Sequence, residues 1–316
     1  MKLIKGQTAE ILAITGVETL PGTYNEPNKL IELAGRTCYK SEDKITEDSA
    51  TKFVDMLKSN KHGAMLEHSW QARRYVFGQS DIIKALYHGK YLHFVFEDDR
   101  HTVVTGNDRA FSEWETKVES ISPRVYQVPY AHEVLTLAEK YNAPELLSMT
   151  AKFVTNRGVT HELVRHRPPS FAQESTRWCN YGNERFGQHC TFIIPSWAYD
   201  YIPEGEYSQV DVWNMAHSLH NSVGEGLQAN AISSWIFAVN SSEQHYFNLL
   251  KNGKKLEEAR DVLPNALKTE IIVTADLQEW EHILNLRFYG TSGKPHFQMK
   301  ELMENFLQQR SAALGL

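Results

Sequence analysis

Residues 165–177 read Arg165-His166-Arg167-Pro168-Pro169-Ser170-Phe171-Ala172-Gln173-Glu174-Ser175-Thr176-Arg177, which gathers charged and hydroxyl side chains around a rigid Pro-Pro step. Arginine is always charged, and its planar fork matches a phosphate or a carboxylate. Each proline fixes its own φ and disfavours the helical conformation in the residue before it. Because Leu163, Val164 and Phe171 anchor the run to apolar surroundings, we interpret it as an ordered anion-binding loop and not as a solvated charged turn.

Arg165 and Arg167 are two residues apart, which places both side chains on the same side of an extended backbone. Pro168 ends any helix that precedes it, so the extended form is favoured. We therefore expect both guanidinium groups to point into one cleft.

The segment resembles the signature of the flavin-dependent thymidylate synthases, in which Arg-His-Arg is followed by two residues, Ser, four residues, Ser, one residue and Arg. The matching positions are Arg165, His166, Arg167, Ser170, Ser175 and Arg177. Further blocks resemble the family in the same order: Gly35 to Tyr39, Glu67-His68, Ala259 to Pro264, and Leu284 to Arg287. A signature with this many defined positions is a specific signal, and the resemblance extends over most of the chain.

The resemblance implies an enzyme that methylates dUMP reductively to dTMP. The implied cofactor is FAD, with 5,10-methylenetetrahydrofolate as the carbon donor and NADPH as the reductant of the flavin. It also implies a homotetramer with sites shared between subunits.

The resemblance also implies which residues contact dUMP. They are Glu162, Arg165, Gln173, Glu174, Ser175, Arg177, Arg260 and Arg287. Arg165, Arg177 and Arg260 are implied to bind the phosphate and neighbouring groups. Arg287 is implied to contact the pyrimidine and stabilise charge that develops on it, so it is a candidate catalytic residue together with Ser175. Glu162 either orients Arg165 or bonds the substrate.

The residues implied to bind the flavin are His68, Arg165, His166, Arg167, Asp276, His282 and His296. We expect His166 to be neutral, because the arginines beside it disfavour its protonated form. Some relatives carry Asn where this chain has Asp276, and an acid is unfavourable beside a pyrophosphate. We therefore expect Asp276 to meet a ribose hydroxyl.

A protein nucleophile and a metal site are both disfavoured by the sequence. Cys179 is the cysteine closest to the arginine motif, and we interpret it as a packing residue. Ser175 lacks a neighbouring base, since Arg177 cannot deprotonate, so we assign it a hydrogen-bonding role at the pyrimidine. Cys179, His189 and Cys190 do not follow a common zinc spacing, so we expect no metal.

Composition restricts the class of protein. A net charge of −6 argues against a general nucleic-acid binder and favours a local arginine pocket. Three cysteines do not form a disulfide framework, and no run of eighteen apolar residues is present. We expect no membrane association and a reducing, cytoplasmic location, or the host cytoplasm for a virally encoded protein. At 316 residues, we expect a single domain over 1–316 with a peripheral insertion around 69–149.

Periodicity predicts an α+β fold, with an antiparallel or mixed sheet packed with helices and a helix-rich C-terminal half. The expected helices cover 27–39, 46–58, 210–227, 277–287 and 297–310, and a short one precedes Arg165. The expected strands cover 92–96 and 102–105, paired as a hairpin, and 151–155. The turn Thr105 to Ala110 is expected to open a helix and to serve in capping.

Two other functions remain open. The same scaffold could modify a pyrimidine nucleotide differently, for instance by hydroxymethylation. An inactive member could instead bind nucleotide or RNA as a regulatory module.

Overall fold

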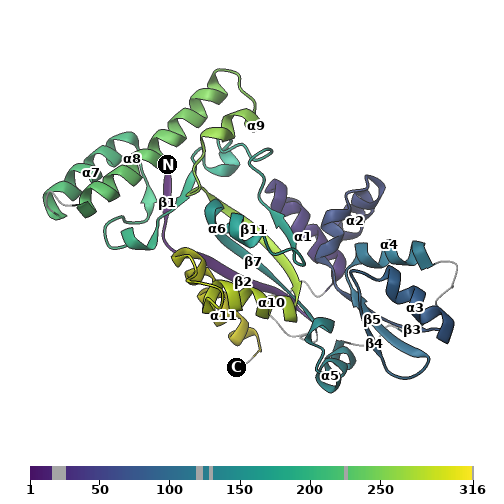
Figure 1. Cartoon of the computed structure of the whole chain (residues 1–316). Coiled ribbons are helices and arrows are strands. Elements are labelled where there is room, and N and C mark those ends of the chain that lie inside the picture. Colours follow the sequence, from purple (N-terminus) through teal and green to yellow (C-terminus); the bar gives the residue numbers. More distant parts are fainter. Residues whose placement is uncertain (16–25, 119–123, 128–130, 224–226, 315–316) are drawn as a thin grey trace.

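The structure is a computed structural model that describes residues 1–15, 26–118, 124–127, 131–223 and 227–314. Its centre is a four-stranded antiparallel sheet in the order β2-β7-β11-β8 (Figure 1). The strands are β2 (Thr8–Ile14), β7 (Ser148–Asn156), β8 (Ser170–Gln173) and β11 (Lys268–Asp276). β7 and β11 pair along their whole length, from Lys268 opposite Asn156 to Asp276 opposite Ser148.

Helices cover both faces of this sheet. On one face, Leu12, Ala172 and Ile272 pack against α1 (Pro27–Tyr39). The other face, which includes Phe153 and Ile271, packs against three helices. These are α6 (Arg157–Leu163), α10 (Leu277–Leu284) and α11 (Phe297–Leu314). Burial on both faces explains why β11 carries an almost continuous buried run and no polar alternation.

A second antiparallel sheet lies at one end of the molecule, in the order β4-β5-β3-β6 (Figure 1). Its strands are β3 (Gln71–Val76), β4 (His93–Phe96), β5 (His101–Gly106) and β6 (Arg124–Gln127). Its helices are α3 (Gln79–His88), α4 (Asp108–Val118) and α5 (Ala131–Tyr141). α2 (Ser49–Ser59) packs against α1. Trp114 fills the core beneath α3 and α4.

A third sheet holds the N-terminal strand β1 (Lys2–Ile4) between β9 (Thr191–Ile193) and β10 (Gly205–Glu206). It shares a core with α8 (Leu227–Lys251) and α7 (Gln209–Val223), which project from the end of the molecule that carries the N-terminus (Figure 1). α9 (Leu256–Ala259) follows. The remaining turns are η1 (Glu42–Lys44), η2 (Gly63–His68), η4 (Pro144–Leu146), η5 (Glu184–Phe186), η6 (Ser196–Ala198), η7 (Arg260–Val262) and the π-helical η8 (Asn285–Tyr289).

The predicted α+β class is confirmed, and so are the helix over 27–39 and the hairpin of β4 and β5. The helix expected over 46–58 begins later, at Ser49, because the Ser49 hydroxyl accepts a hydrogen bond from the Thr46 backbone. The capping role expected for the turn at 105–110 is also confirmed: the Asn107 side chain accepts from the Ala110 N–H at the start of α4.

Other expectations required correction. β11 lies inside the half of the chain that we predicted to be helical. The helix expected over 277–287 is α-helical only to Leu284 and then widens into a π turn. Residues 224–226 of the helix expected over 210–227 lie outside the described residues, and α8 begins at Leu227. Among the described residues, no helix combines the length and apolar character needed to span a bilayer.

Candidate functional site

The loop between α6 and β8 carries the arginine motif. α6 begins at the cap made by Asn156, whose side chain accepts from the Val159 N–H, and a turn at its end leads to the two prolines. Arg165 and Arg167 are exposed, whereas His166 between them is only 6% exposed. Within the described residues neither arginine is paired with a carboxylate.

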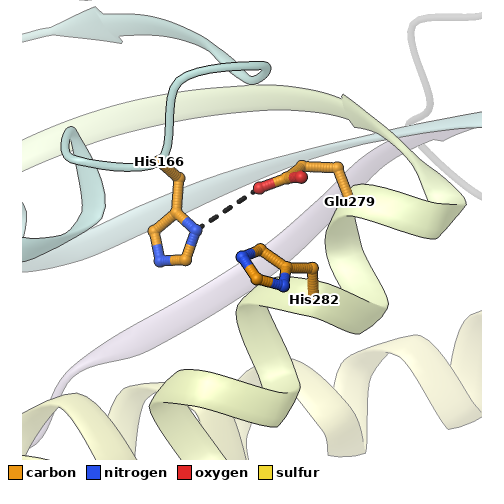
Figure 2. A group of neighbouring side chains, drawn as sticks. All are labelled: His166, Glu279 and His282. Carbon is orange, nitrogen blue, oxygen red and sulfur yellow. Dashed lines mark hydrogen bonds and ion pairs between the residues drawn. The ribbon is translucent and has the colours of Figure 1, made fainter. Parts of the chain in front are cut away.

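His166 lies in a cluster with Glu279 and His282 of α10 (Figure 2). Its Nδ1 is 3.3 Å from Glu279 Oε1. The His282 ring meets it edge-on, with centroids 5.7 Å apart and planes at 74°. On the opposite nitrogen, Arg287 Nε donates to His166 Nε2 over 3.1 Å. The imidazole is therefore held at both nitrogens.

Arg287 is also tied to α6. Its Nη1 donates to Glu162 Oε2 and its Nη2 to the Glu162 backbone carbonyl, each over 3.0 Å. The sequence suggested that Glu162 either orients Arg165 or bonds the substrate. The bond to Arg287 is neither of these. The Glu162 carboxylate orients Arg287, a residue 125 positions away that the local sequence could not identify.

The cluster of His166, Glu279 and His282 has ligand atoms within 4.8 Å of one another, a spacing that could hold a metal ion. A metal on His166 Nδ1 would, however, need that nitrogen without its proton. Arg287 already donates to Nε2 and cannot act as an acceptor, so Nε2 carries no proton either. The ring would then have to be an imidazolate, with neither nitrogen protonated. While the bond to Arg287 stands, the geometry opposes a metal at this position.

A cleft of about 680 Å³ lies beside this cluster. One wall comes from the arginine motif and the end of β11, including Arg167, Ser170 and Asp276. Six further residues line the rest of the cleft: Trp70, Lys90, Tyr91, His93, Asn107 and Arg109. These six residues fall in the 69–149 segment, which we expected to be a peripheral insertion. Arg165 does not line this cleft, so the two forks do not converge there.

Glu67 joins the two walls. One carboxylate oxygen accepts from the Ser170 hydroxyl over 3.1 Å, and the other accepts from Arg109 Nη1 over 2.6 Å. The Ser170 of the motif is therefore fixed by the residue that precedes His68.

His68 itself is fully buried under the central sheet. Its Nδ1 is 2.9 Å from Thr274 Oγ1, and burial lowers its pKa to about 4. Asp276 caps α10 by accepting from the Glu279 N–H over 2.7 Å, and burial raises its pKa. Its second oxygen is 3.6 Å from His93 Nε2 at the cleft. His68 is thus a packed interior residue, whereas Asp276 is within reach of a ligand in the cleft.

The residues predicted to hold dUMP start at the far end of β8. The Gln173 amide donates to Thr160 and Thr269 over 2.9 and 3.2 Å. The Glu174 carboxylate is buried, accepts from the Tyr181 hydroxyl over 3.0 Å and pairs with Lys268. The side chains of Gln173 and Glu174 are therefore occupied by the protein itself, which leaves their backbone for a ligand.

Arg177 and Arg260 come from distant parts of the sequence but reach the same region. Arg177 is exposed, and its Nε is 3.2 Å from Glu257 of α9. Arg260 follows α9 directly and is exposed. The Ser175 hydroxyl accepts from the Arg177 backbone over 3.3 Å. His296 is exposed and packs on Phe297, with centroids 4.5 Å apart.

Sequence reasoning missed Glu279. It stands three residues after Asp276, which is the spacing of a helix capping box. A capping role alone would explain a glutamate at this position, so nothing in the sequence indicated a role in the site. In the structure its carboxylate bonds His166.

The fold and the site define an α+β protein with an arginine-rich loop beside a cleft. Residues 119–313 match the family described as thymidylate synthase complementing protein, and the chain belongs to this family. The flavin-dependent thymidylate synthase of Thermococcus kodakarensis is 29% identical over 187 residues, which are 56% of this chain and 60% of that protein. The enzyme of the same description from Thermococcus onnurineus is 30% identical with the same coverage. The chain thus spans about 60% of the length of these relatives.

Among solved structures, the UMP/dUMP methylase PolB from Streptomyces cacaoi bound with 5-Br UMP aligns with 99% of this chain and 92% of its own. The identity is 15% and the TM-score 0.44.

Proposed function

We propose that this chain is a flavin-dependent thymidylate synthase that converts dUMP to dTMP with FAD, 5,10-methylenetetrahydrofolate and NADPH. Membership of the family supports the reaction class. The observation that carries the proposal is Arg287, which Glu162 and His166 hold at the arginine motif. A permanently charged donor fixed in this way is suited to stabilise negative charge on a pyrimidine ring.

The lining of the cleft fits FAD in its chemistry. Trp70 and Tyr91 offer flat apolar surfaces, and Lys90 and Arg167 have no carboxylate partner within the described part of the chain. These four residues, with Asp276 for a ribose hydroxyl, would hold the cofactor. When bound, FAD would supply the electrons that reduce the transferred one-carbon unit to a methyl group, once NADPH has reduced the flavin.

For dUMP we assign the phosphate to Arg177 and Arg260. The bond from Arg177 to Glu257 is exposed on both sides, and such pairs contribute only about 0.2 to 1 kcal/mol. A phosphate dianion can therefore displace Glu257 without a large penalty. Arg260 has no carboxylate partner among the described residues and remains available for the same group.

Arg287 would meet the uracil. Three of its N–H groups bond Glu162 and His166, and a guanidinium has five. The remaining donors can reach a pyrimidine oxygen while the group stays fixed. A cationic donor on that oxygen stabilises enolate-like negative charge, which makes C5 electron-rich, and removal of one such donor typically costs about 10² to 10³ in rate. Ser175 would hold the pyrimidine by a hydrogen bond.

No thiol of the chain is suited to attack the ring. Burial raises the pKa of Cys38 to about 11 and that of Cys179 to about 12. Burial also raises the pKa of Cys190. Only the thiolate is nucleophilic, so these groups are inert at neutral pH. The mechanism therefore depends on polarisation of the pyrimidine and needs no covalent bond to the protein.

We also propose a homotetramer in which a second subunit completes the site. The exposed position of Arg165, outside the cleft and without a carboxylate partner within the described residues, leaves it available to a ligand held by another subunit.

The test is reconstitution with defined components. We expect a yellow protein that NADPH bleaches without oxygen, and dTMP that appears only when dUMP and methylenetetrahydrofolate are both present. Mass analysis of the product distinguishes dTMP from a hydroxymethylated nucleotide. A colourless protein that binds dUMP without turning it over would refute the enzyme and favour a regulatory module. Light scattering measures the number of subunits.

A further inference from the structure

Four side chains from four parts of the chain form one continuous chain of hydrogen bonds. Glu162 of α6 accepts from Arg287 of η8, Arg287 donates to His166 of the motif loop, and His166 contacts Glu279 of α10. Figure 2 shows the last of these contacts, with His282 beside it on the same helix. His166 is buried and the Glu279 side chain is only 13% exposed, so water does not readily replace either partner.

The chemistry of arginine fixes where the protons lie. A guanidinium carries only donors and does not lose its charge in proteins. His166 Nε2 must therefore be the nitrogen without a proton, because it accepts from Arg287 Nε. In a neutral ring the proton then lies on Nδ1, and it points to a carboxylate that can only accept when ionised. Both ends of the ring agree on a single tautomer.

We propose that Glu279 is a positioning residue for Arg287, which acts by keeping the proton of His166 on Nδ1. This inference rests on the proposed role of Arg287. Without the carboxylate, Arg287 alone opposes a proton on Nε2, so the tautomer with Nε2 protonated becomes populated. An N–H on that side cannot accept from Arg287 and lies against another donor, so the guanidinium loses one of its three anchors. The two bonds to Glu162 alone then leave it less precisely placed for the pyrimidine.

The charged groups around the ring are consistent with this role. Arg287 approaches from η8 and Glu279 from α10, while the exposed His282 of α10 lies edge-on to the ring. Arg165 and Arg167 flank His166 in the loop, and both side chains are exposed to solvent. Glu279 is thus the carboxylate in contact with the ring among the described residues, and its loss has no obvious substitute.

The direct test is the tautomer of His166 in the purified protein, read from the ¹⁵N resonances of labelled histidines and assigned with His166→Gln. We expect a protonated Nδ1 and an unprotonated Nε2 in the natural protein. Glu279→Ala should raise the share of rings with the proton on Nε2, because Arg287 alone then opposes that tautomer, whereas Glu279→Gln should keep the natural tautomer because its amide oxygen still accepts. A ring protonated at Nε2 in the natural protein would overturn the proposal, and so would an unchanged tautomer in Glu279→Ala.

The matched control is Glu281→Ala. Glu281 lies two residues further along α10 and pairs with Arg310 of α11. The Glu281→Ala substitution removes a carboxylate from the same helix without changing a contact of His166. We expect this variant to have the same His166 tautomer and the same turnover as the natural protein.

A second test separates positioning from a general loss of structure. Glu279→Ala should lower dTMP formation by about tenfold, or about 1.4 kcal/mol. Reduction of the flavin by NADPH should stay nearly unchanged. In an Arg287→Ala background the same substitution should have almost no further effect, because it acts through Arg287. Equal effects in both backgrounds would refute the proposal. If the natural protein makes no dTMP, the proposed function fails, while the tautomer experiment still decides the role of Glu279 toward His166.

Discussion

The guanidinium of Arg287 lies 3.0 Å from the carboxylate of Glu162, although the two residues are 125 positions apart. Arg287 stands in the π turn that follows α10, and Glu162 near the end of α6, so the pair joins two of the helices that pack on the same face of the central sheet. A π turn inserts an extra residue into a helix and is often found at functional sites. Here it places Arg287 at the arginine motif.

Arg287→Ala should abolish most dTMP formation without unfolding the protein. We expect a folded, yellow protein whose flavin NADPH still reduces, with dTMP formation lowered by about 10² or more because the charge on the pyrimidine loses its donor. Single-turnover kinetics separate the two half-reactions.

The control for this variant is Arg310→Ala. The Arg310 side chain is 23% exposed, as is that of Arg287, and it also pairs with a glutamate across two helices. It lies in the last helix, outside the proposed site. Normal dTMP formation by Arg287→Ala, or an equal loss in both variants, would remove Arg287 from the proposed role.

Arg177→Lys should weaken dUMP binding by about tenfold, or about 1.4 kcal/mol, because lysine keeps the charge and loses the fork that grips phosphate. Glu257→Gln should instead tighten binding, by at most about 1 kcal/mol, since the side chain that competes for Arg177 loses its charge. Calorimetric titration with dUMP measures both. Arg185→Lys, at another exposed arginine, is the matched control. Unchanged affinity in Arg177→Lys would exclude a bidentate contact with the phosphate.

Each single replacement of Cys38, Cys179 or Cys190 by alanine should leave turnover within about tenfold of the natural rate. Burial keeps all three thiols protonated at neutral pH, so none is prepared to attack the ring. Steady-state dTMP formation is the measurement. One folded variant without any activity would revive a covalent mechanism.

The sequence predicted the elements whose pattern is local. The helix over 27–39 has its proline at the first turn and a regular apolar face, and the hairpin of β4 and β5 has apolar strands around a charged turn. β11 escaped prediction because both of its faces are buried, which removes the alternation that identifies a strand. The role of the 69–149 segment in the cleft also depends on the tertiary fold, which carries Lys90 and Tyr91 to the motif.

The candidate site was predictable only in part for the same reason. The motif itself identified Arg167 and His166, which the structure places at the cleft and in the histidine cluster. The motif could not reveal which distant side chains hold the residues of the site. Glu162 bonds Arg287 and Glu279 bonds His166, over separations of 125 and 113 residues. The resemblance implied His68 for the flavin. In the structure its ring is enclosed and bonds Thr274, and its contact with a flavin stays a prediction.

His68 should make the stability of the protein depend on pH between about 6.5 and 4. Burial lowers its pKa from 6.5 to about 4 in the folded state. Between these values the unfolded chain binds the proton and the folded protein does not, so stability falls as the pH decreases through this window. Above pH 6.5 the ring is neutral in both states and the effect vanishes. The whole shift corresponds to about 3 kcal/mol.

His68→Gln removes the titrating ring and keeps a side chain that can bond Thr274. We expect the variant to be less stable than the natural protein at pH 7, because the cavity is filled less well. Its unfolding temperature should nevertheless fall less steeply between pH 6.5 and 5, a range in which most carboxylates stay ionised. Calorimetric scans across this range measure the slope, with His62→Gln at an exposed position as the control. Parallel slopes for the natural protein and His68→Gln would show that His68 does not control the acid sensitivity. They would also mean that the His68 ring becomes accessible to solvent before it is protonated.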